Sequence, residues 1–344
     1  MSFPIDLQQC TSWDKITEKD SKDFTSLEGL YLIQDPFDLR KTILPILAQT
    51  NPNLNVWKGL GTAFKVDCFG SLMSAQHVFH GLNKDTPCFA MESPGLGYGT
   101  TMPIPKECFT PILTGTYLSY KKDDPMAILQ NRPTEKCFYY DVAAIISQPS
   151  ISINCSTALK INLNRSSISK GDEVMAIGYP HIESLSDINK VYDEKLMCAV
   201  GSITEIYETG RSHLSDGEKW PSFQVDSNWP SGMSGGPVFN KDGHVIGVVS
   251  RSIQNSNESR GTGNVVALPY CAEKFFADAF PSLDTDNPGS VKGWAIIREE
   301  PWELVKIFKD KLQAEKYRSG LSLNSSHHIK YGSNKIGTDD FILL

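Results

Sequence analysis

The sequence predicts a mainly β protein, arranged as an antiparallel barrel or sandwich, and three observations support this. Between residues 57 and 275 the chain holds many short runs rich in β-branched and aromatic residues. Gly, Asn, Asp and Pro separate these runs, as is typical of strands joined by turns. Apolar residues make up 40% and charged residues 21% of the 344 residues, which suits a globular protein long enough to bury a core.

The N-terminal residues 1–56 are polar and mixed, so we expect them to form an extension ahead of the β region. Apolar residues in 36–49 have roughly helical spacing, but Pro45 interrupts it, which predicts one short helix or two turns. Residues 81–137 are turn-rich and predict an insertion or a set of surface loops. The expected strands are 61–67, 70–79, 138–147, 172–180, 201–208, 223–226, 236–240, 244–253 and 264–270.

A change of pattern after residue 271 predicts a C-terminal extension over 276–344, with helices at 272–280 and 301–317. Four apolar residues of the second segment share one helical face: Trp302, Val305, Phe308 and Leu312. We expect an amphipathic helix that packs on the protein body, with partner binding as the weaker alternative. Residues 320–344 are polar, so we expect a loosely ordered tail.

Composition excludes several classes of protein. Acidic residues outnumber basic ones by 40 to 33, giving a net charge of −7, which argues against nucleic-acid binding. No apolar run approaches the length of about 18 residues that a membrane helix needs. The first 20 residues have no features of a secretory signal, and the eight cysteines form no CxxC pair. We therefore expect a cytoplasmic protein with reduced thiols and no metal site.

The sharpest motif is Ser-Gly-Met-Ser-Gly-Gly-Pro-Val-Phe at 231–239. Ser234 lies between glycines and between two expected strands, which predicts a nucleophile in a tight loop. Gly232 permits backbone geometry that other residues resist. The amides of Gly232 and Ser234 would then point at one spot and stabilise a developing oxyanion. The alternative is a glycine-rich hairpin with an inert serine, which the length of the motif disfavours.

A serine nucleophile needs a base, because its hydroxyl is weakly reactive unaided. His77 lies at the end of an expected strand, within 74–79, and is the preferred candidate. His80 is the nearest alternative. The remaining histidines lie in polar or turn contexts that indicate surface positions: His181, His213, His244, His327 and His328.

The base in turn needs a carboxylate that holds its tautomer. Asp141 leads directly into the apolar run 142–146, which is an unusual place for a carboxylate. By itself it could be a turn or cap residue. Asp123 and Asp124 are the alternatives, although Asp-Asp-Pro is typical of an exposed turn.

Taken together, these motifs resemble the chymotrypsin-fold (trypsin-like) serine proteases, and are most similar to the bacterial trypsin-like or HtrA-type branch without a PDZ domain. His77, Asp141 and Ser234 follow one another along the chain in the same order as the catalytic residues of that family. The matching stretches are 61–64, 74–78, 141–145, 171–180, 224–226, 243–250 and 264–269. The resemblance spans residues 57–275. It implies two antiparallel six-stranded barrels, at 57–160 and 165–275, with the active site between them.

Roles follow from this resemblance. Ser234 would attack the scissile carbonyl, His77 would transfer its proton to the leaving amine, and Asp141 would orient His77. The amides of Gly232 and Ser234 would hold the oxyanion. This mechanism requires no metal or organic cofactor.

Substrate recognition is implied at two places. Ser250, Arg251 and Ser252 would form the edge that pairs with the substrate backbone. By register, Asn228 would lie at the base of the primary pocket and Ser252 on its wall. A neutral base argues against strict Lys or Arg specificity, so we expect a neutral or polar residue before the cut. The alternative is that Asp226 projects into this pocket.

We therefore predict an intracellular, regulated serine endopeptidase acting on protein or peptide substrates, with bacterial defence or stress as a candidate setting. Met233 replaces the aspartate by which secreted relatives bind a newly cut N-terminus, so we do not expect activation by that route. A cytosolic protease endangers its host, so we expect control by a regulatory protein partner, by substrate recognition or by a disordered oxyanion loop. The alternatives are a catalytically silent peptide-binding module and an esterase. The order of the motifs disfavours an α/β-hydrolase.

Overall fold

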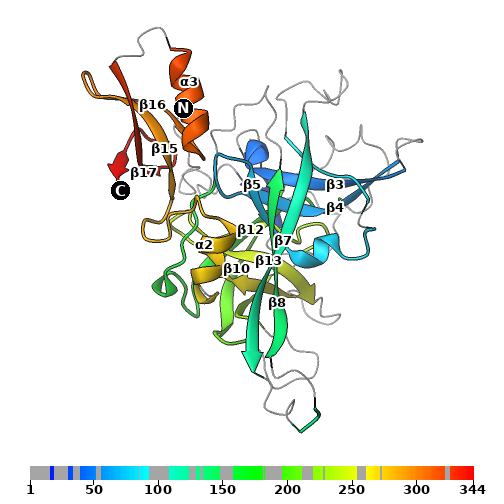
Figure 1. The fold of residues 1–344 in the computed structure, drawn as a ribbon. Coiled ribbons are helices and arrows are strands. Elements are labelled where there is room, and N and C mark those ends of the chain that lie inside the picture. Colours follow the sequence, from blue (N-terminus) through cyan, green and yellow to red (C-terminus); the bar gives the residue numbers. More distant parts are fainter. Residues whose placement is uncertain are drawn as a thin grey trace.

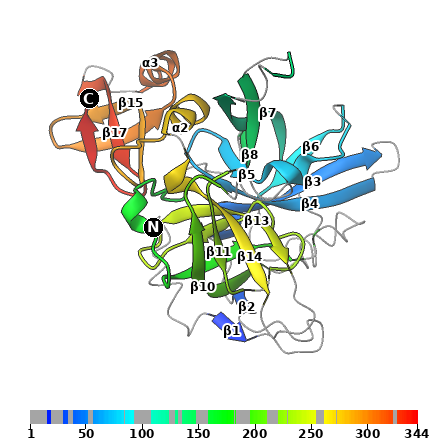
Figure 2. The same cartoon turned by 90° about the horizontal axis from the view of Figure 1, so that it is seen from below.

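The computed structural model describes residues 16–18, 30–33, 39–51, 56–83, 85–92, 108–123, 129–131, 135–147, 158–180, 182, 196–210, 220–227, 229–253, 261–271, 273–321 and 326–344. Two β-barrels make up the body, and a smaller sheet lies beside them (Figures 1 and 2). The mainly β prediction with two six-stranded antiparallel barrels is confirmed.

Barrel one closes in the order β3-β4-β5-β8-β7-β6. Its strands are β3 (Ile43–Asn51), β4 (Val56–Lys65), β5 (Ser71–Ser74), β6 (Cys88–Met91), β7 (Phe109–Asp123) and β8 (Glu135–Ser147). Every pairing is antiparallel. Apolar side chains such as Ile46, Leu47 and Phe64 are fully buried in its core.

Two sequence predictions for this barrel are wrong. The helix expected at 36–49 is strand β3, preceded by a short 3₁₀ turn at Leu39–Lys41, so the barrel begins at residue 43 and not at 57. Residues 43–48 are all buried, and a fully buried strand gives a continuous apolar run that periodicity cannot distinguish from a helix. Pro45 pairs with Thr62 of β4 and lies outside the pairing with β6, so its missing N–H is tolerated there. The turn-rich stretch 81–137 supplies β6 and β7 rather than only loops.

Barrel two contains β9 (Glu173–Gly178), β10 (Met197–Tyr207), β11 (Ser222–Val225), β12 (Pro237–Phe239), β13 (Val245–Ile253) and β14 (Thr262–Ala267). The ring closes because β9 pairs with both β12 and β10. Two further strands, β1 (Ile16–Glu18) and β2 (Leu30–Ile33), extend the sheet from β10. The N-terminal segment therefore adds strands to barrel two, where a helical extension was expected.

The C-terminal region is a four-stranded antiparallel sheet in the order β16-β15-β17-β18. It comprises β15 (Ser290–Arg298), β16 (Glu303–Phe308), β17 (His327–Lys335) and β18 (Phe341–Leu343), with helix α3 (Lys311–Ser319) against it. Helix α2 (Glu273–Ala279) precedes it, as predicted for 272–280. The predictions of a single helix at 301–317 and of a loosely ordered tail at 320–344 are both wrong. Asp310 divides the segment, since its carboxylate accepts the amide of Gln313 at 2.8 Å and starts α3 there.

This sheet is fixed to barrel one through buried groups. The side chain of Asp67, after β4, accepts the backbone amides of Phe69 and Ser71 and the hydroxyl of Ser282. Ala158, Val291 and Ile336 form a small apolar cluster at the same junction. Within the described ranges, no helix is both long and apolar enough to cross a membrane.

Candidate active site

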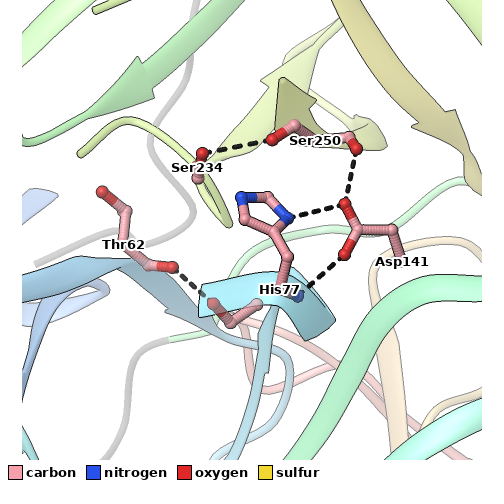
Figure 3. A network of polar contacts seen from close by, with 6 residues as sticks. Thr62, His77, Asp141, Ser234 and Ser250 are labelled. Atoms are coloured by element: carbon pink, nitrogen blue, oxygen red, sulfur yellow. Dashed lines mark hydrogen bonds and ion pairs between the residues drawn. The ribbon is translucent and has the colours of Figure 1, made fainter. Parts of the chain in front are cut away.

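His77 and Asp141 meet because β5 and β8 are paired. Ser74, the last residue of β5, lies opposite Ala143 of β8, and the chain then turns through a 3₁₀ helix at Gln76–Phe79. The backbone amide of His77 donates to Oδ1 of Asp141 at 2.9 Å, and Nδ1 lies 2.8 Å from Oδ2 (Figure 3). The carboxylate thus holds the main chain and the ring of the same histidine. His80 is exposed at the end of this turn and makes no such contact.

Asp141 is buried, and a third group from barrel two reaches it. The hydroxyl of Ser250, in β13, donates to Oδ2 at 2.5 Å. Burial raises the pKa of Asp141, but the hydrogen bonds and charge of His77, with the bond from Ser250, outweigh it, so the pKa lies below its ordinary value. The carboxylate is therefore ionised near neutral pH and can orient an imidazole and stabilise its protonated form.

Ser234 lies across the barrel boundary from His77. Its hydroxyl donates to the backbone carbonyl of Ser250 at 3.1 Å. Figure 3 shows the second ring nitrogen of His77 on the side of the ring that faces Ser234. In the described part of the chain no hydrogen bond joins these two side chains. Ser250 thus contacts both Asp141 and Ser234. Its hydroxyl donates to Asp141, and its backbone carbonyl accepts the hydroxyl of Ser234.

Thr62 of β4 holds the loop that carries Ser234. Its amide donates to the carbonyl of Ser234 at 2.8 Å, and its hydroxyl donates to the carbonyl of Gly232 at 2.8 Å. The same hydroxyl accepts the amide of Tyr179 at 3.1 Å. Two carbonyls of the loop, on either side of Met233, are thereby bound to barrel one.

The loop leaves two amides available. The carbonyl of Met233 accepts the amide of Gly236 at 2.9 Å, so the N–H of Ser234, on the other side of that trans peptide, points the opposite way. Among the described residues, the amides of Gly232 and Ser234 have no hydrogen-bond acceptor in the protein. These are the two amides that the sequence predicts for an oxyanion site, and that role stays a prediction.

Glycine is required at two places in this loop. Gly232 and Gly235 have φ angles of +92° and +85°, which other residues rarely adopt. A Cβ on Gly235 would lie 2.1 Å from the carbonyl oxygen of Thr62 and 2.2 Å from Oγ of Ser74. Close packing of the loop on barrel one therefore depends on Gly235.

The predicted recognition edge lies on β13 beside Ser234. Ser250 is buried, Arg251 is exposed and Ser252 is partly buried. Asn228 lies outside the described residues. Asp226, the alternative for this pocket, accepts the amide of Ser202 on β10 through its carboxylate.

Some predictions about side chains need correction or addition. His327 was expected at the surface but is buried in β17. Sequence reasoning missed Thr62 and the hydroxyl of Ser250, because each acts through a contact with the other barrel. Among the residues that the structure describes, no cluster of three His, Cys, Asp or Glu side chains could hold a metal ion.

Comparisons with known proteins give a family match and a set of similar solved structures. The family profile of the trypsin-like peptidase domain matches residues 61–248. The Rv3671c protease from M. tuberculosis, in its active form, is 16% identical, with 71% of this chain and 81% of that chain covered and a TM-score of 0.41. The HtrA-type protease AlgW with a decapeptide is 17% identical, with 87% and 77% covered and a TM-score of 0.44. The search of curated proteins finds no match.

Proposed function

The chain belongs to the trypsin-like peptidase family and is a serine endopeptidase, and we propose that Ser234, His77 and Asp141 form its catalytic triad. The observation that carries this proposal is the pair of hydrogen bonds from His77 to Asp141, with the second ring nitrogen facing Ser234. A histidine oriented by an ionised carboxylate and placed beside a serine is the arrangement that activates a hydroxyl nucleophile.

The proposed reaction has two halves. In the first, Ser234 Oγ attacks the scissile carbonyl carbon while His77 accepts its proton, and the tetrahedral intermediate collapses when His77 donates that proton to the leaving amine. In the second, water attacks the acyl ester, its proton passes to His77, and Ser234 leaves with that proton. Asp141 stays ionised throughout and stabilises the imidazolium.

The free amides of Gly232 and Ser234 would bind the carbonyl oxygen as it gains charge. Such donors act mainly in the transition state, because the negative charge develops only there. Thr62 supports this function indirectly, since its bonds to the two loop carbonyls fix the peptide orientations.

The resting position of the Ser234 hydroxyl suggests how substrate would engage it. The carbonyl of Ser250 accepts this hydroxyl at 3.1 Å, and the same carbonyl lies on the edge proposed to pair with substrate. An N–H of a bound peptide would compete for that carbonyl and release the hydroxyl toward His77. Active-site hydrogen bonds often tighten only in the substrate complex.

We further propose an intracellular role under the control of a regulatory protein or of the substrate itself, with bacterial defence or stress as a candidate setting. The residue before the nucleophile, Met233, is fully buried and apolar. It offers no charge to a newly cut N-terminus, which supports control by another route. The net charge of −7 supports protein or peptide partners over nucleic acid.

Labelling with a fluorophosphonate probe tests the triad. The wild type should be labelled at Ser234, located by mass spectrometry, while Ser234→Ala and His77→Ala should not. The second candidate is a silent peptide-binding module, which is favoured by the bond of Ser234 to Ser250 in place of His77. No labelling of the wild type, with or without a peptide substrate, would support that candidate.

A further inference from the structure

The indole of Trp229 lies on barrel two next to the recognition edge. Its backbone amide donates to the hydroxyl of Ser252 at 3.4 Å. Its ring packs directly on Gly263, where a Cβ would lie 2.5 Å from two carbons of the six-membered ring. Ser252 and Gly263 are paired neighbours on β13 and β14. The indole therefore covers the surface that these two strands present beside residue 252.

That surface adjoins the nucleophile. Ser234 contacts the carbonyl of Ser250, two residues from Ser252 on the same strand. A peptide held at the edge of β13, with its scissile carbonyl at Ser234, would direct the side chain before the cut into the space beside Ser252 and Gly263. Trp229 is only 3% exposed, so the indole is part of the packed wall and not a mobile cover.

We propose that the Trp229 indole fills the pocket for the residue before the cut and restricts that residue to small uncharged side chains such as Ala, Ser or Gly. This inference rests on the proposed function, since it assumes that Ser234 marks the point of cleavage. It narrows the expectation of a neutral or polar residue to one of small size.

The charges around the indole agree with the exclusion of Lys and Arg. The carboxylate of Asp226, three residues before Trp229 in the chain, is bound to the amide of Ser202. The only polar atom of the Trp229 side chain is an N–H donor, which is buried without a hydrogen-bond partner in the described part of the chain. A donor offers nothing to an ammonium or guanidinium group. In the described surroundings of the indole, neither space nor charge favours a long basic side chain.

Peptidyl diphenyl phosphonates test the proposal directly, because they react with the serine only after the side chain at the first position is seated. Three compounds that differ only in Ala, Phe or Lys at that position should be compared by their second-order rates of modification. The wild type should react with the Ala compound about tenfold or more faster than with the Phe compound, and not measurably with the Lys compound.

Trp229→Ala should raise the rate with the Phe compound about tenfold or more and reduce the preference for Ala. Trp229→Leu is the second variant, because it leaves less empty volume if Trp229→Ala unfolds. Trp57→Phe, in barrel one, is the matched control and should keep the wild-type order. The rate of labelling by a simple fluorophosphonate, which has no side chain to seat, is measured for every variant, and each phosphonate rate is divided by it.

Two results would overturn the inference. One is a wild type that reacts with the Phe or Lys compound as fast as with the Ala compound. The other is an unchanged order in both folded Trp229 variants. If Ser234 is not reactive at all, the proposed function fails. Calorimetry with Ser234→Ala would then still measure how tightly the pocket binds peptides that end in Ala, Phe or Lys. Preferential binding of the peptide ending in Ala would support the inference, and equal binding would contradict it.

Discussion

The hydroxyl of Thr62, in β4 of barrel one, donates a 2.8 Å hydrogen bond to the carbonyl of Gly232 in the nucleophile loop of barrel two. Both residues belong to the buried boundary between the barrels, where Thr62 has no exposed surface. The bond fixes a peptide of the same loop that presents the two free amides. Barrel one therefore supplies the His–Asp pair and also part of the support for the proposed oxyanion site.

Thr62→Val should lower kcat about tenfold to a hundredfold with little change in KM. Valine has nearly the same shape but leaves the carbonyl of Gly232 and the amide of Tyr179 without their partner. The loop would then hold its amides less firmly at the developing oxyanion. Steady-state kinetics on a cleaved peptide measure the split between kcat and KM.

Thr62→Ser is the control for this variant, because it keeps the hydroxyl and should retain most of the wild-type kcat. Thermal unfolding of both variants reports whether the boundary has loosened as a whole. Equal kcat values for the two variants would show that the hydroxyl does not support catalysis.

Asp141→Asn should reduce kcat about 10⁴-fold while the fold remains intact. An amide donates from nitrogen, so it cannot accept the backbone amide, the ring and the Ser250 hydroxyl in the same way as the carboxylate does. The ring of His77 would then adopt the wrong tautomer. Single-turnover acylation kinetics measure this loss, and Asp242→Asn, on an exposed turn, should leave the rate unchanged. A loss of rate of less than about tenfold would show that Asp141 is not the residue that orients His77.

Ser250→Ala should have a smaller effect on kcat/KM, about tenfold, because one charge-assisted hydrogen bond to Asp141 is lost while both bonds to His77 stay. The bond favours the ionised carboxylate, so its removal raises the pKa of Asp141 toward the ordinary value. The pH below which activity is lost should therefore stay the same or rise. A rate equal to that of the wild type at all pH values would show that the hydroxyl is dispensable.

The candidate site was predicted from motifs that are each local in the sequence. The loop 231–239 and the contexts of His77 and Asp141 are local signals, and the structure brings all three residues to one boundary. Thr62 and Ser250 act on partners far away in the chain, so no local pattern could reveal those contacts. The contact between Trp229 and Gly263 likewise joins residues that are far apart in the chain, so no local pattern could reveal it.

The failures of the fold prediction have a common physical cause. Residues 43–48 form a continuous apolar run, and the segment 301–317 has apolar residues on one helical face, yet strands occupy 43–51 and 303–308. The first segment becomes strand β3 because it pairs with β4 and β6, and the second becomes strand β16 because it pairs with β15. Tertiary contacts of this kind override local periodicity. Sequence alone could not identify the C-terminal sheet, because its central pairing joins β15 to β17, and β16 and α3 lie between these two strands in the chain.

Ser282→Ala should lower the free energy of unfolding by about 1–3 kcal/mol, because it removes a donor from the buried carboxylate of Asp67. Ser282 lies between α2 and β15, so the loss should loosen the C-terminal sheet more than the barrels. Hydrogen exchange should rise first at β15 and β17. Ser319→Ala, on the exposed end of α3, is the control and should leave exchange unchanged. Equal exchange in both variants would contradict the fixing role of Asp67.

Asp284 should give the C-terminal sheet a stability that depends on pH. Its buried carboxylate accepts Ser333 Oγ at 2.5 Å and Asn287 Nδ2 at 2.9 Å, and Lys292 Nζ lies at 3.2 Å. Burial raises its pKa, but these bonds and the charge of Lys292 outweigh it, so the pKa lies below its ordinary value. A group with a lowered folded pKa stabilises the fold above its unfolded pKa, about 3.9 for Asp, and that stabilisation is lost as the pH falls through the folded value.

Asp284→Asn should therefore lower the free energy of unfolding by about 1–3 kcal/mol at pH 7, and the deficit relative to the wild type should shrink below about pH 4. Denaturant unfolding at both pH values measures the difference. Asp286→Asn is the matched control: its side chain is 79% exposed and lies 3.9 Å from the same lysine, so it should change little at either pH. A deficit of the same size at pH 7 and pH 3 would show that packing, and not ionisation of Asp284, accounts for the loss.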